Sequence, residues 1–344
     1  MRGVAIILVV YLHAWFSAWA VTPHSQVLAI HVIHLFAHSA VPVFFFMSAY
    51  LLAHDSSANF GEYVRRKLQR ILLPLAVAMT ATLLYRLWQE GWTAQLRHDL
   101  LVFDLAGQYY YLLVLVVFMA GFWPARFVPQ RRLTQLLVVA FAINLATIAW
   151  YQSSTISGDF ATFAYRNPAV WVFSFAFGYW SGRRGDALAY ATRLLPAALA
   201  AMAAIMTFYL VRGEGFGDYP VSYFGVSVFL FACCGLAAYP ALARMALSRR
   251  ITAIAVRPFE ELSRYAFAIY LFHIPFFLGW LTDTYVSDSA VKTDYWDLLH
   301  TRFLVAFVST TVFVVLAAKL WPRGAELFLG VDPPHRKAEN ATTT

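Results

Sequence analysis

The sequence predicts an all-α protein, a polytopic membrane helix bundle of about ten transmembrane helices with both termini in the cytoplasm. Three observations predict this fold: the share of hydrophobic residues, the recurrence of long apolar segments, and the distribution of Lys and Arg between loops. Of the 344 residues, 61% are hydrophobic and 13% are charged, whereas soluble domains are roughly 45–50% apolar and about 25% charged. A globular protein of this length cannot hide so much apolar surface from water, so we expect it to lie in a lipid bilayer.

Ten segments approach the roughly 20 mostly apolar residues that a transmembrane helix needs, although the sixth is short. Residues 55–70 mix basic and apolar side chains, which suits a short interfacial helix before the third span. Pro42 is expected to kink the second span, because proline lacks the N–H that an inner helical turn uses. The expected spans are 3–21, 32–53, 71–88, 108–123, 133–151, 168–182, 190–211, 222–243, 262–281 and 302–321.

Positive residues indicate the orientation of the bundle. The two ends and the loops after even-numbered spans carry 19 of the 26 Lys and Arg residues, whereas the other loops carry six. Lys and Arg collect on the cytoplasmic side of membranes, so both termini are expected in the cytoplasm, in agreement with an even number of spans. We expect one transmembrane domain over residues 1–330 and a flexible cytoplasmic tail over 331–344.

Net charge and cysteine content argue against several classes of protein. The formal net charge is +8, but the basic residues lie in short loops between apolar spans, so membrane topology explains them and no nucleic-acid partner is expected. Cys233 and Cys234 are adjacent, which favours neither a disulfide framework nor a zinc site, and no metal site is expected. The sequence contains no GxGxxG, Walker, HExxH or GxSxG motif.

Ionisable side chains at membrane depth are costly and are therefore candidates for function. His13 lies midway along the first span, eleven residues after Arg2. Eleven residues are close to three helical turns, so both side chains lie on one face, about 16 Å apart along the axis. This spacing suits a long ligand with its anionic end at Arg2 and its reactive end at His13. Alternatively, Arg2 is an ordinary positive-inside anchor and His13 donates to a backbone carbonyl.

Other polar residues are weaker candidates. Arg66, Lys67 and Arg70 suit phosphate binding, although an anchor at the membrane surface would use the same residues. His38 is the last of three histidines on one face of the second span and belongs either to a cavity or to a wet helix mouth. An aromatic belt is the simpler explanation for Tyr110. The second-rank residues, which either line a cavity or only satisfy helix contacts, are His38, Ser48, Tyr110, Tyr270 and His273.

Four segments follow one another along the chain in a recognisable order. They are Arg2-Gly3 with His13 eleven residues after the arginine, Val41-Pro42 with Phe44-Phe45 and Ser48, Lys67-Leu68-Gln69-Arg70 through Pro74, and Tyr270-Leu271-Phe272-His273-Ile274-Pro275. In this order they resemble the acyltransferase-3 family of integral membrane acyltransferases, and the resemblance spans nearly the whole chain. The family usually has Ser-Gly where this chain has Ser48-Ala49.

The resemblance implies a membrane O-acyltransferase that moves an acyl group, usually acetyl, from cytoplasmic acyl-CoA to a sugar hydroxyl. The implied acceptor is a carbohydrate such as a cell-envelope polysaccharide, or a lipid-linked sugar, and the implied location is the bacterial inner (plasma) membrane. Acyl-CoA is then a co-substrate, and no cofactor is expected to be tightly bound. His13 is the expected catalytic residue, either as a general base or as the acyl carrier. The expected donor-binding residues are Arg2, Arg66, Lys67 and Arg70.

Three other functions use some of the same features. A transporter of an anionic lipid-linked saccharide would use the basic face and the cavity without acyl chemistry. A b-type haem protein would pair histidines across spans, such as His13 with His34 or His38. A sensor or assembly scaffold fits least well, because it gives no reason for polar groups at membrane depth.

Overall fold

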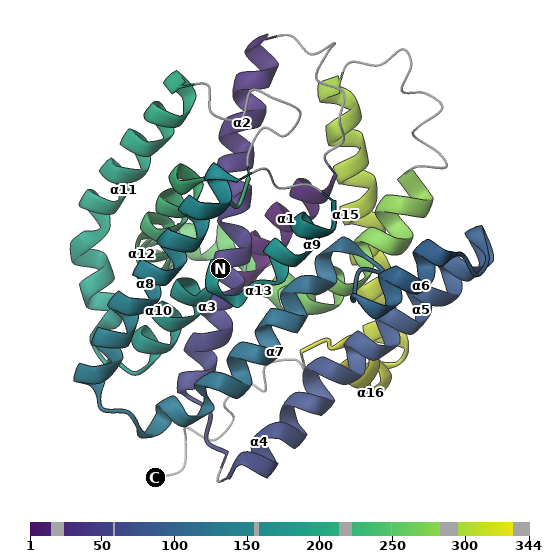
Figure 1. Cartoon of the computed structure of the whole chain (residues 1–344), viewed down its shortest axis with the longest axis horizontal. Coiled ribbons are helices and arrows are strands. Elements are labelled where there is room, and N and C mark those ends of the chain that lie inside the picture. The colour runs from purple at the N-terminus through teal and green to yellow at the C-terminus, as the bar shows by residue number, and fades with distance from the viewer. Residues whose placement is uncertain are drawn as a thin grey trace.

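The computed structural model describes residues 1–14, 24–57, 59–154, 158–212, 222–248, 250–282 and 295–332. In these ranges the regular structure is helical and contains no strand, which confirms the all-α bundle (Figure 1). Eight helical segments of the described chain are long and apolar enough to cross a membrane. They are Ala29–Ala53, Phe60–Glu90, Gly107–Phe127, Gln130–Ser153, Ala187–Val211, Val226–Ser248, Thr252–Gly279 and Asp297–Leu320.

The first and sixth of the ten expected spans are shorter helices, α1 (Arg2–His13) and α10 (Val172–Gly182). Helix α1 contacts α2, α3, α13 and α15 and lies near the middle of the molecule in Figure 1. Helix α10 is mostly buried and packs on α3 and α8. Of the first span expected over 3–21, residues 15–21 lie outside the described residues.

The second expected span is divided into two helices, α2 (His24–His38) and α3 (Ala40–Ala53), which meet at Ser39. Pro42 is the third residue of α3, a position in the first turn where the missing N–H costs no helical hydrogen bond. The expected irregularity is therefore a break just before the proline. It leaves the histidines on α2 and Ser48 on α3.

The third expected span begins with the basic segment. Helix α4 (Phe60–Lys67) passes through a π-helical turn, η2 (Leu68–Leu72), into α5 (Leu73–Glu90). Pro74 is in the first turn of α5, where proline is well tolerated. The interfacial helix expected over 55–70 thus begins at Phe60. Residues 54–57 form a short connection between α3 and α4.

The remaining elements complete the bundle. They are α6 (Ala94–Leu101), η3 (Gly107–Tyr109), α7 (Tyr110–Phe122), η4 (Trp123–Phe127), α8 (Gln130–Ser153), α9 (Gly158–Arg166), η5 (Pro168–Val170), α11 (Ala187–Arg212), α12 (Val226–Ser248), α13 (Arg250–Phe272), η6 (His273–Thr282), α15 (Tyr295–Leu320), α16 (Pro322–Gly324) and η8 (Ala325–Leu329).

Val331 and Asp332, the first residues of the expected tail, lie against the bundle: Val331 is buried and the Asp332 N–H donates to the Arg264 carbonyl at 2.9 Å. Residues 333–344 lie outside the described residues.

Two glycines allow α10 to approach α3 closely. A Cβ atom on Gly178 would lie 2.1 Å from the Phe46 carbonyl oxygen, and one on Gly182 would lie 2.8 Å from the Tyr50 carbonyl oxygen. The four-residue spacing of Gly178 and Gly182 is the small-residue pattern that permits close helix packing in membranes. This contact holds α3, and with it Ser48, against the interior of the bundle.

The Gly178→Ala variant is expected to be destabilised by about 1–3 kcal/mol, because the added methyl group meets backbone atoms that cannot turn away. The measurement is the thermal unfolding midpoint of the purified protein in detergent. Gly121→Ala in α7 is the matched control, since nothing lies within 4 Å of the added Cβ there. Equal midpoints for both variants would show that α10 and α3 can separate without cost.

Candidate active site

Two histidines that are far apart in the chain meet inside the bundle. His13 is the last residue of α1, and His273 is the first residue of the π-helical segment η6. His13 Nδ1 lies 3.1 Å from His273 Nε2, which is a hydrogen-bond distance. His273 is completely buried. The pair brings the segment that contains Arg2 and His13, the first of the four family-like segments, into contact with the last, residues 270–275.

The backbone partners of the two rings determine which nitrogen carries a proton. His273 Nδ1 lies 2.9 Å from the Tyr270 carbonyl and 3.1 Å from the Ile269 carbonyl, so this nitrogen is a donor. Its Nε2 is then an acceptor in the neutral ring. His13 Nδ1 faces two acceptors, His273 Nε2 and the Val9 carbonyl at 2.9 Å, and therefore carries the proton of that ring. His13 Nε2 is left with the lone pair.

The local sequence explains the position of His273. Pro275 has no backbone N–H, so the regular helical pattern cannot continue through it. The helix widens from α13 into η6 at His273, and widened turns of this kind are frequent at functional sites. His273 Nδ1 consequently reaches the carbonyls of both the third and the fourth preceding residue.

A cavity of about 400 Å³ lies at one end of the bundle and brings together most of the sequence-predicted residues. We call this the basic end. The cavity is lined by residues from α1, α3, α4, η2, α7, α13 and the segment after α15. The predicted residues that line it are Arg2, Ser48, Arg66, Lys67, Arg70 and Tyr270.

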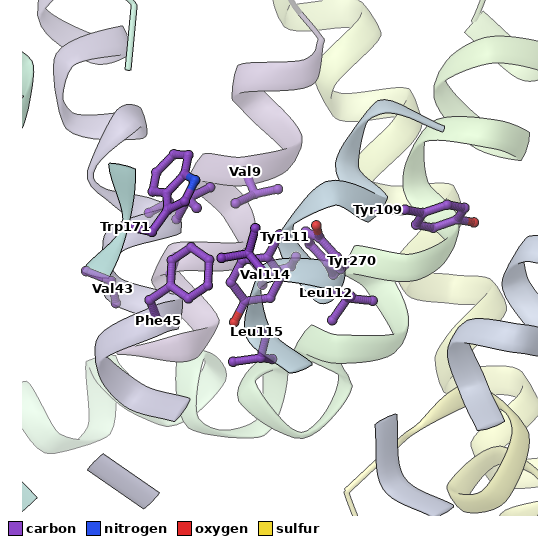
Figure 2. Close-up of a cluster of buried hydrophobic side chains, with 14 of the residues drawn as sticks. Val9, Val43, Phe45, Tyr109, Tyr111, Leu112, Val114, Leu115, Trp171 and Tyr270 are labelled. Carbon is purple, nitrogen blue, oxygen red and sulfur yellow. The ribbon is translucent and has the colours of Figure 1, made fainter. Parts of the chain in front are cut away.

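Aromatic rings connect this cavity to the histidine pair. The centroids of the Tyr111 and Tyr270 rings are 5.4 Å apart, and both residues line the cavity. Figure 2 shows the two side chains beside each other. Ser48 Oγ is 3.3 Å from Tyr111 Oη. The Tyr270 ring also lies 6.1 Å from the His273 ring, measured between centroids. The Tyr270 hydroxyl donates to the Gln108 carbonyl, which holds the ring in this position.

The cations of the basic end differ in how their charge is balanced. Lys67 Nζ lies 3.3 Å from Asp55, and Arg66 forms a helical pair with Glu62. Burial alone would raise the pKa of Asp55, but hydrogen bonds from Ser57 and the nearby Lys67 ammonium hold that pKa below its ordinary value. Asp55 is therefore an anion that neutralises Lys67.

Arg2 and Arg70 keep their charge available to a ligand. Arg2 pairs with Asp332 at 3.2 Å, and both side chains are partly exposed, at 31% and 46%. Such a pair contributes little free energy, so a phosphate can replace the carboxylate. Arg70 is exposed and has no ion-pair partner in the described part of the chain.

Four predicted residues are absent from the lining of the basic-end cavity: His13 and His273, which form the pair described above, and His38 and Tyr110. The His38 ring lies 4.4 Å from the Tyr223 ring, and its Nδ1 is 2.8 Å from the His34 carbonyl. Tyr110 packs against Tyr165, with 5.5 Å between the ring centroids. The His38 and Tyr110 rings lie beside Tyr165, Trp171 or Tyr223, in a part of the aromatic core that does not line the cavity. Within the described ranges, no group of three or more His, Cys, Asp or Glu side chains could hold a metal ion.

Sequence reasoning missed three residues of this site. Tyr111 follows Tyr110 in the sequence, but the helical phase of α7 points Tyr111 and not its neighbour into the cavity. Asp55 could have been found, because an acidic residue just before a basic segment is a natural ion-pair partner. Asp332 had no local signal, since it reaches Arg2 across the whole length of the chain.

Comparison with known proteins identifies the family of the chain. A family model described as an acyltransferase domain matches residues 1–319, which covers both histidines and all the cations named above. No curated protein and no solved structure matches the chain. Since the family model covers most of its length, the chain belongs to the acyltransferase-3 family of membrane acyltransferases.

Proposed function

We propose that this protein transfers an acyl group, acetyl in the first instance, from cytoplasmic acyl-CoA to a hydroxyl group of a carbohydrate or of a lipid-linked sugar. The observation that carries the proposal is the pairing of His13 with His273 inside the bundle, because His13 shares α1 with Arg2, which lines the basic-end cavity. Neither histidine lines that cavity, but the Tyr270 ring, which does line it, lies 6.1 Å from the His273 ring. The orientation that the Lys and Arg distribution favours would place the basic end in the cytoplasm, where acyl-CoA is found.

The cations of the cavity suit the donor. Coenzyme A carries several phosphate charges on a long, thin arm that ends in the thioester. Guanidinium groups bind phosphate through paired hydrogen bonds, and Arg2, Arg66 and Arg70 offer such groups around one space. The thioester arm would then extend past Ser48, Tyr111 and Tyr270 toward the histidines. The donor is a co-substrate that leaves as free CoA after each turnover.

The chemistry requires one proton to move twice. The lone pair on His13 Nε2 takes the proton of the acceptor hydroxyl while the hydroxyl oxygen attacks the thioester carbonyl. The new C–O bond forms and the C–S bond breaks, so the acyl group becomes an ester. The imidazolium then gives its proton to the departing thiolate. His273 Nε2 accepts the hydrogen bond from His13 Nδ1 throughout, which favours the positively charged ring.

The test is acyl transfer from radiolabelled acetyl-CoA by the purified protein in lipid vesicles. We expect release of free CoA, with label in a sugar ester when an acceptor is present. The matched sample is His13→Ala protein at the same concentration. Saturable movement of a lipid-linked saccharide without any dependence on acyl-CoA would contradict the proposal and favour a transporter. Label trapped on the protein at His13 would replace the general base with an acyl-carrier mechanism.

The Arg2→Ala variant is expected to raise the KM for the donor about tenfold and to leave kcat nearly unchanged. A hydrogen bond to a charged group is worth roughly 1.5–3 kcal/mol, and this one forms with the bound donor and persists in the transition state. The measurement is the dependence of the initial rate on acyl-CoA concentration. Arg65→Ala is the control, because Arg65 belongs to the same basic segment but does not line the cavity. An unchanged KM in Arg2→Ala would make Arg2 only a membrane anchor.

A further inference from the structure

A second polar pocket lies at the basic end, beside the cavity already described. Its volume is about 220 Å³, and it shares Asp55 with the larger cavity. The pocket lies between the end of α3, the segment η4 and the end of α10. Its cations are Arg126 and Arg183, neither of which lines the larger cavity. Gly182 brings Arg183 here, because it lets α10 end against Ala53 of α3.

The two guanidinium groups bring charge that nearby carboxylates do not cancel. Arg126 Nη1 donates to the Ser57 carbonyl at 2.9 Å, and Arg183 Nη1 donates to the Arg126 carbonyl at 2.8 Å. Carbonyl groups satisfy these N–H groups but carry no net charge. In the described part of the chain, no carboxylate lies within ion-pair distance of either arginine. Asp55 is already paired with Lys67, so the pocket is net positive.

Trp123 also lines this pocket, and its indole N–H is a buried donor without an acceptor among the described residues. Trp123 Nε1 is shielded from solvent and has no hydrogen-bond partner among the described residues. A buried N–H that lacks an acceptor is costly, and proteins rarely leave one in that state. The Arg126 guanidinium lies 5.3 Å from the centre of the same indole ring. The Trp123 ring is therefore one wall of a pocket in which two guanidinium groups could bind an oxyanion.

An apolar groove lies near Trp123. It has a volume of about 90 Å³ and lies between α7 and the helical segment formed by α4 and η2. Phe60 lines the groove, and its ring is 5.1 Å from the Trp123 ring. Phe127, next to Arg126, is 74% exposed. Exposed aromatic rings beside arginines are typical of the interface between membrane and water.

We infer that this pocket binds the phosphate headgroup of an anionic membrane phospholipid, with one acyl chain in the adjoining groove. Guanidinium forks match phosphate oxygens, and basic pockets between transmembrane helices recognise anionic lipid headgroups. The groove favours a lipid over a soluble phosphate as the ligand, because only a lipid has a hydrocarbon chain that could lie in the groove. The site is independent of the acyl donor and of His13.

The experiment titrates dioleoyl-phosphatidylglycerol into the full-length protein in neutral detergent and counts bound lipids by native mass spectrometry. We expect one tight site for phosphatidylglycerol and weaker binding of phosphatidylcholine with the same chains. Arg183→Ala should weaken the tight site about tenfold, because a charged hydrogen bond is lost. Arg131→Ala should leave it unchanged, since that exposed arginine lies at the start of α8 outside the pocket.

Trp123→Phe replaces the indole with a smaller phenyl ring, so it removes the N–H and part of the wall against which the Arg126 guanidinium packs. It tests the pocket even where an arginine variant folds poorly. We expect it to weaken phosphatidylglycerol binding about threefold. Equal affinity of the wild type and the Arg183→Ala and Trp123→Phe proteins would overturn the proposal. Displacement of the bound lipid by soluble coenzyme A would also overturn it and would assign the pocket to the acyl donor.

Discussion

Replacement of His13 with alanine is expected to lower kcat by about 10²–10⁴-fold, the usual contribution of a positioned general base. The physical reason is that His13 Nε2 holds the free lone pair of the histidine pair, whereas His13 Nδ1 and both nitrogens of His273 are committed to hydrogen bonds within the protein. The measurement is the rate of CoA release from labelled acetyl-CoA at saturating donor.

The donor affinity separates loss of chemistry from loss of folding in this variant. His13→Ala should still bind acyl-CoA with nearly the wild-type dissociation constant, because the cations of the basic-end cavity are intact. His98→Ala is a suitable control, since His98 is an exposed histidine beside Asp99 and outside the cavity. A His13→Ala protein that turns over at the wild-type rate would remove His13 from the reaction.

Replacement of His273 with leucine is the second expected large effect, a fall in kcat of about 10–100-fold. Leucine fills a similar volume but cannot accept the hydrogen bond from His13 Nδ1. The His13 ring then loses the partner that orients it and stabilises its charged form, a bond worth roughly 1.5–3 kcal/mol. His273 is thus a positioning residue, because it acts on the substrate only through His13.

His273→Gln distinguishes this role from simple packing. A glutamine side-chain carbonyl can accept from His13 Nδ1, so this variant should recover much of the lost kcat, and the KM for the donor should stay constant in both proteins. The readout is kcat and KM measured separately. Equal losses in the leucine and glutamine variants, or a loss confined to KM, would contradict a hydrogen-bonding role.

Much of the architecture could be predicted from the residues alone because helix formation in a membrane is a local matter. A segment of about 20 apolar residues must satisfy its own backbone hydrogen bonds, and only a helix does so. Each of the ten expected spans corresponds to a helix or part of one, and the breaks near Pro42 and Pro275 follow from a missing N–H. The shared helix of Arg2 and His13 also follows from local periodicity.

The basic residues show where local reasoning reaches its limit. Arg66, Lys67 and Arg70 could be assigned to one end of the bundle by counting charges, and they do line one cavity. The number of Lys and Arg residues in each loop does not show that Asp55 neutralises Lys67, or that Arg126 and Arg183 belong to a different pocket. These distinctions depend on how helices rotate and pack against one another.

The reactive pair itself required the packed structure. His13 and His273 are 260 residues apart, and no short-range pattern in the sequence specifies that α1 lies against η6 or that one imidazole faces the other. Likewise, Tyr111 and not Tyr110 reaches the cavity because of the rotation of α7, and Asp332 reaches Arg2 because the chain folds back after α15. Apolar periodicity determines which segments become helices. Contacts such as Gly178 against Phe46 determine how those helices dock, and docking depends on shape complementarity between distant surfaces.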